Sequence, residues 1–122
     1  MNSIVLYIED NADNVRLVEL LLKRRPHTEL QVATNGRDGV QAAIGQRPTL
    51  ILLDNHLPDA TGSEILRQLA SAEATAGIPV IILTGDSSGV AADELLAIGA
   101  CEFLEKPFDI HQLMATIDRY LP

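Results

Sequence analysis

One stretch of the sequence decides the fold of this chain, LILLDNHLP at residues 50–58. Its four leading apolar residues predict a short strand buried on both faces, as in the interior of a parallel sheet. The strand stops at Asp54, and an unpaired carboxylate is costly inside a protein core. We therefore expect Asp54 at the carboxyl end of the strand, the edge where open α/β sheets bind ligands. The simpler alternative is an aspartate that only ends a strand or caps a turn.

Composition points to one acidic domain over residues 1–122. Hydrophobic residues make up 47% of the chain, which suffices for one core. The net charge of −8, from 9 basic and 17 acidic residues, argues against direct binding to nucleic acid. No apolar run is long enough for a membrane span, and the first residues do not predict a signal peptide. The single Cys101 fits a reducing, cytoplasmic setting, and we expect it to fill space in the core.

Strand-like and helix-like segments alternate along the rest of the chain. Four further segments have the composition of strands: residues 4–8, 30–32, 80–83 and 101–104. Five segments have the apolar spacing of helices: residues 12–24, 40–44, 65–69, 88–98 and 109–120. The sequence therefore predicts an α/β fold, a doubly wound parallel sheet with helices on both faces.

Several of these strands end at residues that can take part in chemistry. Glu9-Asp10 follow the first strand, Thr84 follows the fourth, and Lys106 follows the fifth. Because the carboxyl ends of parallel strands meet at one edge, we expect these side chains to converge with Asp54. Three carboxylates repel one another, which favours a proton or a hard divalent cation among them, and Mg²⁺ suits them best. A carboxylate, Mg²⁺, a hydroxyl and a lysine together indicate phosphoryl transfer.

These strand ends resemble the receiver domain of response regulators in two-component signalling, and the resemblance covers essentially the whole chain. The matching motifs are Glu9-Asp10, Asp54 with Leu57-Pro58 and Gly62, Thr84-Gly85, and Lys106-Pro107. The resemblance implies five parallel strands in the flavodoxin-like order 2-1-3-4-5. It also implies a signalling switch that catalyses its own aspartyl phosphorylation and dephosphorylation.

The resemblance implies how the phosphoryl group is handled. Asp54 would accept it from a sensor histidine kinase or a histidine phosphotransfer protein, and Thr84 and Lys106 would bind its oxygens. Thr84 and Phe103 would then act as the switch that is read by a downstream effector protein or domain.

The resemblance also implies the metal site and the neighbours of the phosphoryl group. Asp10 and Asp54 would bind Mg²⁺, Glu9 would act through metal-bound water, and His56 would contribute its main-chain carbonyl. The side chains of His56 and Asp86 should flank the path of the water that removes the phosphoryl group, so we expect them to tune its lifetime. Between a base that activates this water and a bulky group that obstructs it, we favour the base for His56.

Oligomeric state and domain context stay open at the level of sequence. The last helix does not clearly show the basic residues of receivers that dimerise, so dimerisation is undecided. Residues 6–11 look similar to receivers attached to hybrid sensor kinases. A stand-alone receiver and a receiver within a longer protein therefore both remain possible.

Two other classes of protein share parts of this pattern. A Mg²⁺-dependent phosphohydrolase of the haloacid-dehalogenase type also uses a strand-end aspartate, a Thr or Ser, and a Lys. It needs a second aspartate two residues after the nucleophile as general acid, where this chain has His56. A flavin-binding module of similar topology needs a phosphate-binding loop after the first strand, where Glu9-Asp10 would repel phosphate. The receiver is therefore our first prediction and the phosphohydrolase its alternative.

Overall fold

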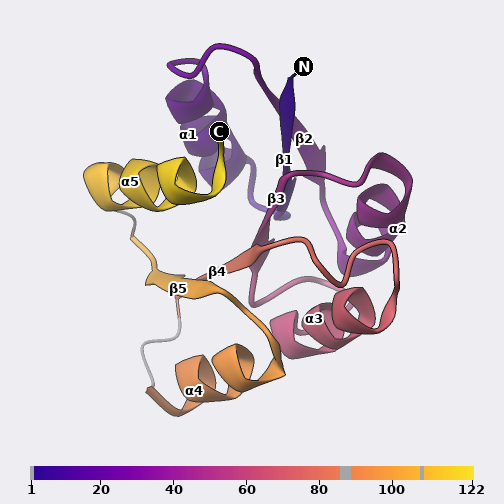
Figure 1. The fold of residues 1–122 in the computed structure, drawn as a ribbon. Helices are drawn as coiled ribbons and strands as arrows, with labels where there is room; N and C mark the ends of the chain where they lie inside the picture. The colour runs from indigo at the N-terminus through magenta and orange to yellow at the C-terminus, as the bar shows by residue number, and fades with distance from the viewer. Residues whose placement is uncertain (1, 86–88, 108) are drawn as a thin grey trace.

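Five strands and five helices alternate along residues 2–85, 89–107 and 109–122, which a computed structural model describes (Figure 1). The strands are β1 (Ser3–Ile8), β2 (Thr28–Ala33), β3 (Leu50–Asp54), β4 (Val80–Thr84) and β5 (Glu102–Glu105). The helices are α1 (Ala12–Leu22), α2 (Gly36–Gln46), α3 (Gly62–Ser71), α4 (Gly89–Ile98) and α5 (Ile110–Tyr120). Within these ranges, every helix falls short of the length and apolar character that crossing a bilayer requires.

The strands form one parallel sheet in the order β2-β1-β3-β4-β5. This confirms the predicted doubly wound sheet and its order, with β2 at one edge. The register pairs Ile8 of β1 with Leu53 of β3, and Asp54 of β3 with Leu83 of β4. The residues that end these three strands therefore lie side by side at one edge of the sheet.

Helices cover both faces of the sheet (Figure 1). α1 and α5 pack on one face, over a core that includes Tyr7 and Leu52. α2, α3 and α4 pack on the other, over a core that includes Ile8 and Leu53. Neighbouring residues of a strand point to opposite faces, which is why each strand contributes to both cores. β3 and β4 are buried along their whole length, in keeping with their uninterrupted apolar sequences.

Polar side chains set where the helices near the carboxyl ends of the strands begin. Asn11 caps α1, because its Oδ1 accepts hydrogen bonds from the main-chain N–H groups of Asp13 and Asn14. Thr61 and Glu64 form a reciprocal capping box at the start of α3. α1 ends before the expected residue 24, because the main chain tightens into i→i+3 hydrogen bonds after its last turn.

Cys101 is exposed, so the prediction that it fills the core is wrong. β5 begins after it, at Glu102, and is an edge strand in which only Leu104 is fully buried. An edge strand is covered on fewer sides than β3 or β4, so an apolar run here does not imply burial of each residue. The residue before Cys101, Ala100, is the one that enters the core.

Candidate functional site

Three carboxylates meet at the carboxyl edge of the sheet. Glu9 and Asp10 follow β1, and Asp54 ends the neighbouring strand β3. One oxygen of each carboxylate lies within 4.8 Å of the corresponding oxygens of the other two. Glu9 is fully buried and Asp54 is 5% exposed, whereas Asp10 faces solvent. The structure thus brings the three acidic residues together, with two of them largely removed from water.

Lys106 supplies positive charge beside these carboxylates. Its Nζ lies 2.8 Å from Glu9 Oε1 and 3.2 Å from Asp54 Oδ1. The loop that carries it is fixed to β4, because the Lys106 main-chain N–H donates to the Thr84 carbonyl at 2.7 Å. Thr84 itself is fully buried at the end of β4. A lysine that follows β5 therefore contacts the acidic residues of β1 and β3.

The two carboxylate oxygens of Glu9 have different surroundings. Oε1 accepts hydrogen bonds from Lys106 Nζ, from Asn14 Nδ2 at 2.5 Å and from Tyr7 Oη at 3.4 Å. Oε2 is buried and has no hydrogen-bond partner among the described residues. Burial raises the pKa of Glu9, and so does the neighbouring Asp54. Burial also raises the pKa of Tyr7, so its phenol stays protonated and acts as a donor.

The set of donor atoms fits a hard divalent cation. Mg²⁺ is bound in proteins by carboxylate oxygens and water. Three carboxylates facing one ammonium group leave this edge short of positive charge. The unpartnered Oε2 of Glu9 is an acceptor that a cation, or water bound to it, would satisfy. Glu9, Asp10 and Asp54 are therefore the side chains that can hold Mg²⁺ here.

Hydrogen bonds hold the loop between β3 and α3 to Asp54 and to the start of α2. The His56 N–H donates to Asp54 Oδ1 at 3.3 Å, while the His56 side chain is exposed. A Cβ on Gly62 would meet Asn55 Oδ1 at 2.5 Å, so only glycine fits there without displacing its neighbour. The Asp59 carboxylate accepts from two main-chain N–H groups at the start of α2, at 2.7 and 3.0 Å. These bonds lower the pKa of Asp59 and hold the loop against α2.

The remaining expected residues concern the switch and the lifetime of the phosphoryl group. Phe103 of β5 is half-buried and packs against the core beneath α2, α3 and α4. It also lines a cavity of about 420 Å³ together with residues of α4 and α5. Asp86 lies outside the described residues. The structure thus places Phe103 beside a hollow between two helices, next to the strand that ends at Thr84.

Reasoning from sequence missed Tyr7, Asn14 and Asp59. Tyr7 had a usable signal, because residues two apart on a strand share a face and Glu9 comes two residues later. Asn14 lies in the first turn of a predicted helix, where an asparagine is usually explained by capping. Asp59 had no local signal, because its partner at Gly36 is 23 residues away in the chain.

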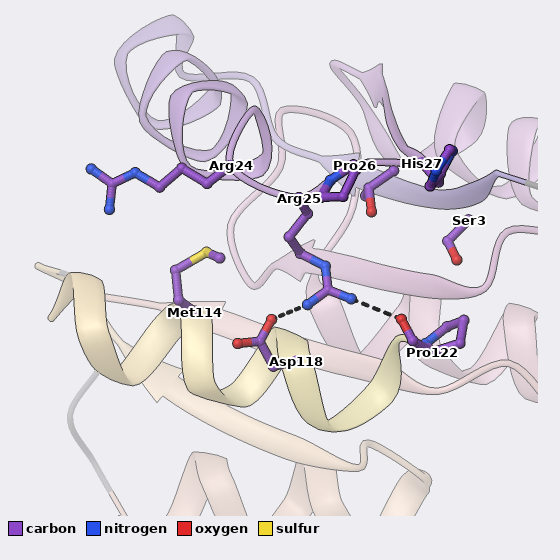
Figure 2. A pocket seen from close by; sticks show the side chains of 9 residues that line it. Ser3, Arg24, Arg25, Pro26, His27, Met114, Asp118 and Pro122 are labelled. Atoms are coloured by element: carbon purple, nitrogen blue, oxygen red, sulfur yellow. Dashed lines mark hydrogen bonds and ion pairs between the residues drawn. The ribbon is translucent and has the colours of Figure 1, made fainter.

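A larger cavity, of about 670 Å³, lies at the opposite end of the sheet, near the starts of β1 and β2 (Figure 2). Arg25 crosses this region, forming an ion pair with Asp118 of α5 and donating to the Pro122 carbonyl at 3.0 Å. Its Nε is buried without a partner among the described residues. The cavity is lined by basic side chains from the end of α1, with Asp118 paired to one of them. The cluster of Glu9, Asp10 and Asp54 therefore lies outside this larger cavity.

The fold and the site define a doubly wound α/β domain with a lysine beside a carboxylate cluster at the strand ends. Residues 5–118 match the response regulator receiver domain family, and the chain belongs to this family. It is therefore a receiver domain of two-component signal transduction, as the resemblance implied. The match gives no support to the phosphohydrolase alternative.

Two curated relatives of the chain are response regulators. Response regulator ArlR from Staphylococcus saprophyticus is 34% identical over 113 residues, covering 93% of this chain and 50% of that protein. The ArlR protein of Staphylococcus aureus strain Mu50 is 36% identical over 115 residues, with the same coverage of both chains. The chain thus spans about half the length of the curated relatives it matches.

Solved structures of receiver domains superpose on nearly the whole chain. The signal receiver domain of a putative LuxO repressor protein from Vibrio parahaemolyticus gives a TM-score of 0.91 at 30% identity, covering 98% of this chain and 90% of that one. The receiver domain of sensor histidine kinase PA1611 from Pseudomonas aeruginosa PAO1 gives 0.87 at 27% identity, covering 98% of both chains. The latter was solved with a magnesium ion coordinated in its active site cleft.

Proposed function

We propose that this domain is a Mg²⁺-dependent phosphorelay receiver in which Asp54 accepts a phosphoryl group from a phosphohistidine. The observation that carries the proposal is the position of Lys106 Nζ, in contact with both Glu9 and Asp54. The unpartnered buried oxygen of Glu9 supports a cation at the same place. The magnesium ion in the receiver domain of PA1611 supports Mg²⁺ as that cation.

The transfer needs a nucleophile, an electrophilic clamp and a leaving group. A carboxylate oxygen of Asp54 attacks phosphorus, the phosphorus–nitrogen bond of the donor breaks, and the departing imidazole keeps the electron pair. The ammonium of Lys106 and the hydroxyl of Thr84 stabilise the negative charge on the phosphoryl oxygens. When bound, Mg²⁺ supplies further positive charge to those oxygens. Glu9, Asp10 and Asp54 would hold the metal, with the His56 carbonyl as the main-chain ligand.

The partners follow from this chemistry. A phosphohistidine donor is a sensor histidine kinase or a histidine phosphotransfer protein, and the phosphorylated state needs a downstream effector protein or domain to read it. The excess of acidic residues suits protein partners better than nucleic acid. We place the domain in the cytoplasm, where response regulators generally act.

The proposal is tested by labelling with acetyl phosphate in the presence of Mg²⁺. Intact-mass analysis should show one phosphoryl group per chain, and none in Asp54→Asn or with a chelator. Asp93→Asn, an exposed position on α4, is the matched control and should label normally. Mg²⁺ at a hundredfold excess over its Kd should raise the free energy of unfolding by about 2.7 kcal/mol. Full labelling of Asp54→Asn, or a melting curve unchanged by Mg²⁺, would contradict the site.

We also propose that Phe103 passes the phosphorylated state to the surface formed by α4, β5 and α5. Movement of Thr84 toward the phosphoryl group frees space that the ring can enter, and full burial of such a ring is worth about 1.5 to 3 kcal/mol. That energy suffices to bias a two-state equilibrium. Phe103→Ala should accept label on Asp54 yet lose the phosphorylation-dependent chemical-shift changes of α4 and α5. If phosphorylation changes the chemical shifts of α4 and α5 in Phe103→Ala as it does in the wild type, Phe103 is a core residue only.

A further inference from the structure

We propose that Asn14 is a positioning residue, which fixes the orientation of the Glu9 carboxylate so that one of its oxygens stays free for the cation. This inference rests on the proposed Mg²⁺ site and adds to it a residue from α1. Asn14 Nδ2 donates to Glu9 Oε1 at 2.5 Å, the shortest of the contacts made by that oxygen. Glu9 Oε2 is left buried without a partner among the described residues.

Asn14 differs from Lys106 because it contacts no second carboxylate of the cluster in the described structure, and from Tyr7 because its contact with Glu9 is short. Lys106 is shared between Glu9 and Asp54, so any movement of its ammonium toward a phosphoryl group weakens its contact with Glu9. Tyr7 Oη is 3.4 Å from the same oxygen, near the limit of a hydrogen bond. Asn14 is therefore the donor that can hold the Glu9 carboxylate in place while the Lys106 ammonium binds the phosphoryl group.

The backbone of Asn14 is itself held in place. Its main-chain N–H donates to Asn11 Oδ1 at 3.2 Å, within the cap of α1. Val18, one turn further along the helix, is fully buried against the sheet. A side chain from a capped and packed first turn thus reaches the residue that follows β1. This arrangement makes α1 part of the support of the metal site, in the way that outer residues orient metal ligands.

The inference is tested by calorimetric titration of the whole domain with MgCl₂. Asn14→Leu keeps a side chain of similar size without the donor, and Asn14→Ala removes both size and donor. We expect both variants to bind Mg²⁺ about tenfold more weakly than the wild type, as for other losses of a ligand-orienting hydrogen bond. Asn11→Ala is the matched control, because it removes an asparagine from the same helix turn and weakens α1 without touching Glu9. It should melt at a lower temperature, and because it leaves the Asn14 side chain in contact with Glu9, it should weaken Mg²⁺ binding less than Asn14→Leu does.

Three results would overturn the inference and can be told apart. If Asn14→Leu binds Mg²⁺ like the wild type, Asn14 has only a packing role while the metal site stands. If the wild type binds no Mg²⁺, the metal site fails and the role of Asn14 fails with it. A Kd in Asn11→Ala weakened as much as in Asn14→Leu would show that loosening α1, and not the loss of one donor, is responsible.

Discussion

The two ends of the sheet handle charge in opposite ways. At the amino ends of the strands, Arg25 pairs with Asp118, which is 49% exposed, and donates to the Pro122 carbonyl (Figure 2). One cation meets one anion there, and water shares in their solvation. At the carboxyl ends, Lys106 meets two carboxylates that are both buried, and the exposed Asp10 adds a third. The pair of Arg25 and Asp118 is balanced and stabilises the fold, whereas the carboxyl end keeps an excess of negative charge that can bind a cation.

The comparison shows that charge balance locates the site better than volume does. The amino end contains a cavity of about 670 Å³, and a search for hollows alone would lead there. Each end has one buried polar atom without a partner among the described residues, Arg25 Nε and Glu9 Oε2, so the carboxyl end is recognised instead by its excess of carboxylates over cations and by a raised Glu9 pKa. Membership of the receiver family supports the choice of the carboxyl end.

The largest effect should come from removing the cation at the carboxyl end. In Lys106→Met, Glu9 and Asp54 lose the donor that they share. Because the side chain of Lys106 is only 20% exposed, the loss should approach the cost of breaking a buried ion pair, about 3 kcal/mol of unfolding free energy. Mg²⁺ should restore part of this loss, since it is an alternative source of positive charge. Denaturant unfolding in a chelator and in saturating Mg²⁺ measures both quantities.

The control for this prediction is Lys23→Met. Lys23 is the other lysine of the chain and is exposed at the end of α1. Its replacement should change the unfolding free energy by less than about 0.5 kcal/mol, with or without Mg²⁺. Equal losses in the two variants would mean that Lys106 behaves as an ordinary surface charge, and the contrast between the two ends would disappear.

An intermediate effect of opposite sign should follow from Glu9→Gln. The amide keeps the size of the side chain, removes a buried charge next to Asp54, and can donate toward that carboxylate. We expect the metal-free domain to gain about 1 kcal/mol of unfolding free energy, while the stabilisation by Mg²⁺ shrinks. Glu29→Gln, exposed on β2, is the matched control and should change neither quantity. A less stable Glu9→Gln would show that the native carboxylate is already well compensated without metal.

Much of the carboxyl end could be predicted from the sequence because the residues that end its strands leave local signals. An apolar run that stops at Asp54 indicates both a buried strand and a polar strand end. The same signal at Glu9 and at Thr84, combined with the rule that parallel strands share an edge, predicts that these residues meet. Parallel topology thus converts local patterns into a long-range prediction. The order of the strands, by contrast, was predicted only from the family resemblance.

The parts that could not be predicted depend on contacts between distant segments or on partial burial. Arg25 and Asp118 are 93 residues apart, and nothing in either local sequence names the other as its partner. Asn14 lies in the first turn of α1, after the cap Asn11, and nothing in the local sequence shows that its side chain reaches back to Glu9. Cys101 was misplaced because the strand begins one residue later than predicted, at Glu102, and because β5 lies at the edge of the sheet, where fewer residues are covered.

The smallest effect should come from the amino end, in Arg25→Ala. The ion pair with Asp118 is partly exposed, and pairs of this kind contribute about 1 kcal/mol or less, diminishing further at high salt. Arg24→Ala is the matched control, since Arg24 is among the residues that line the same cavity but its guanidinium points away from Asp118 (Figure 2). The two variants should differ in their free energy of unfolding at low salt and have similar values at high salt. Labelling of Asp54 and the stabilisation by Mg²⁺ should be the same in both as in the wild type, because the ion pair lies at the other end of the strands. If Arg25→Ala changed the stabilisation by Mg²⁺, the two ends would be energetically coupled, and stabilising and functional charges could not be assigned to separate ends of the sheet.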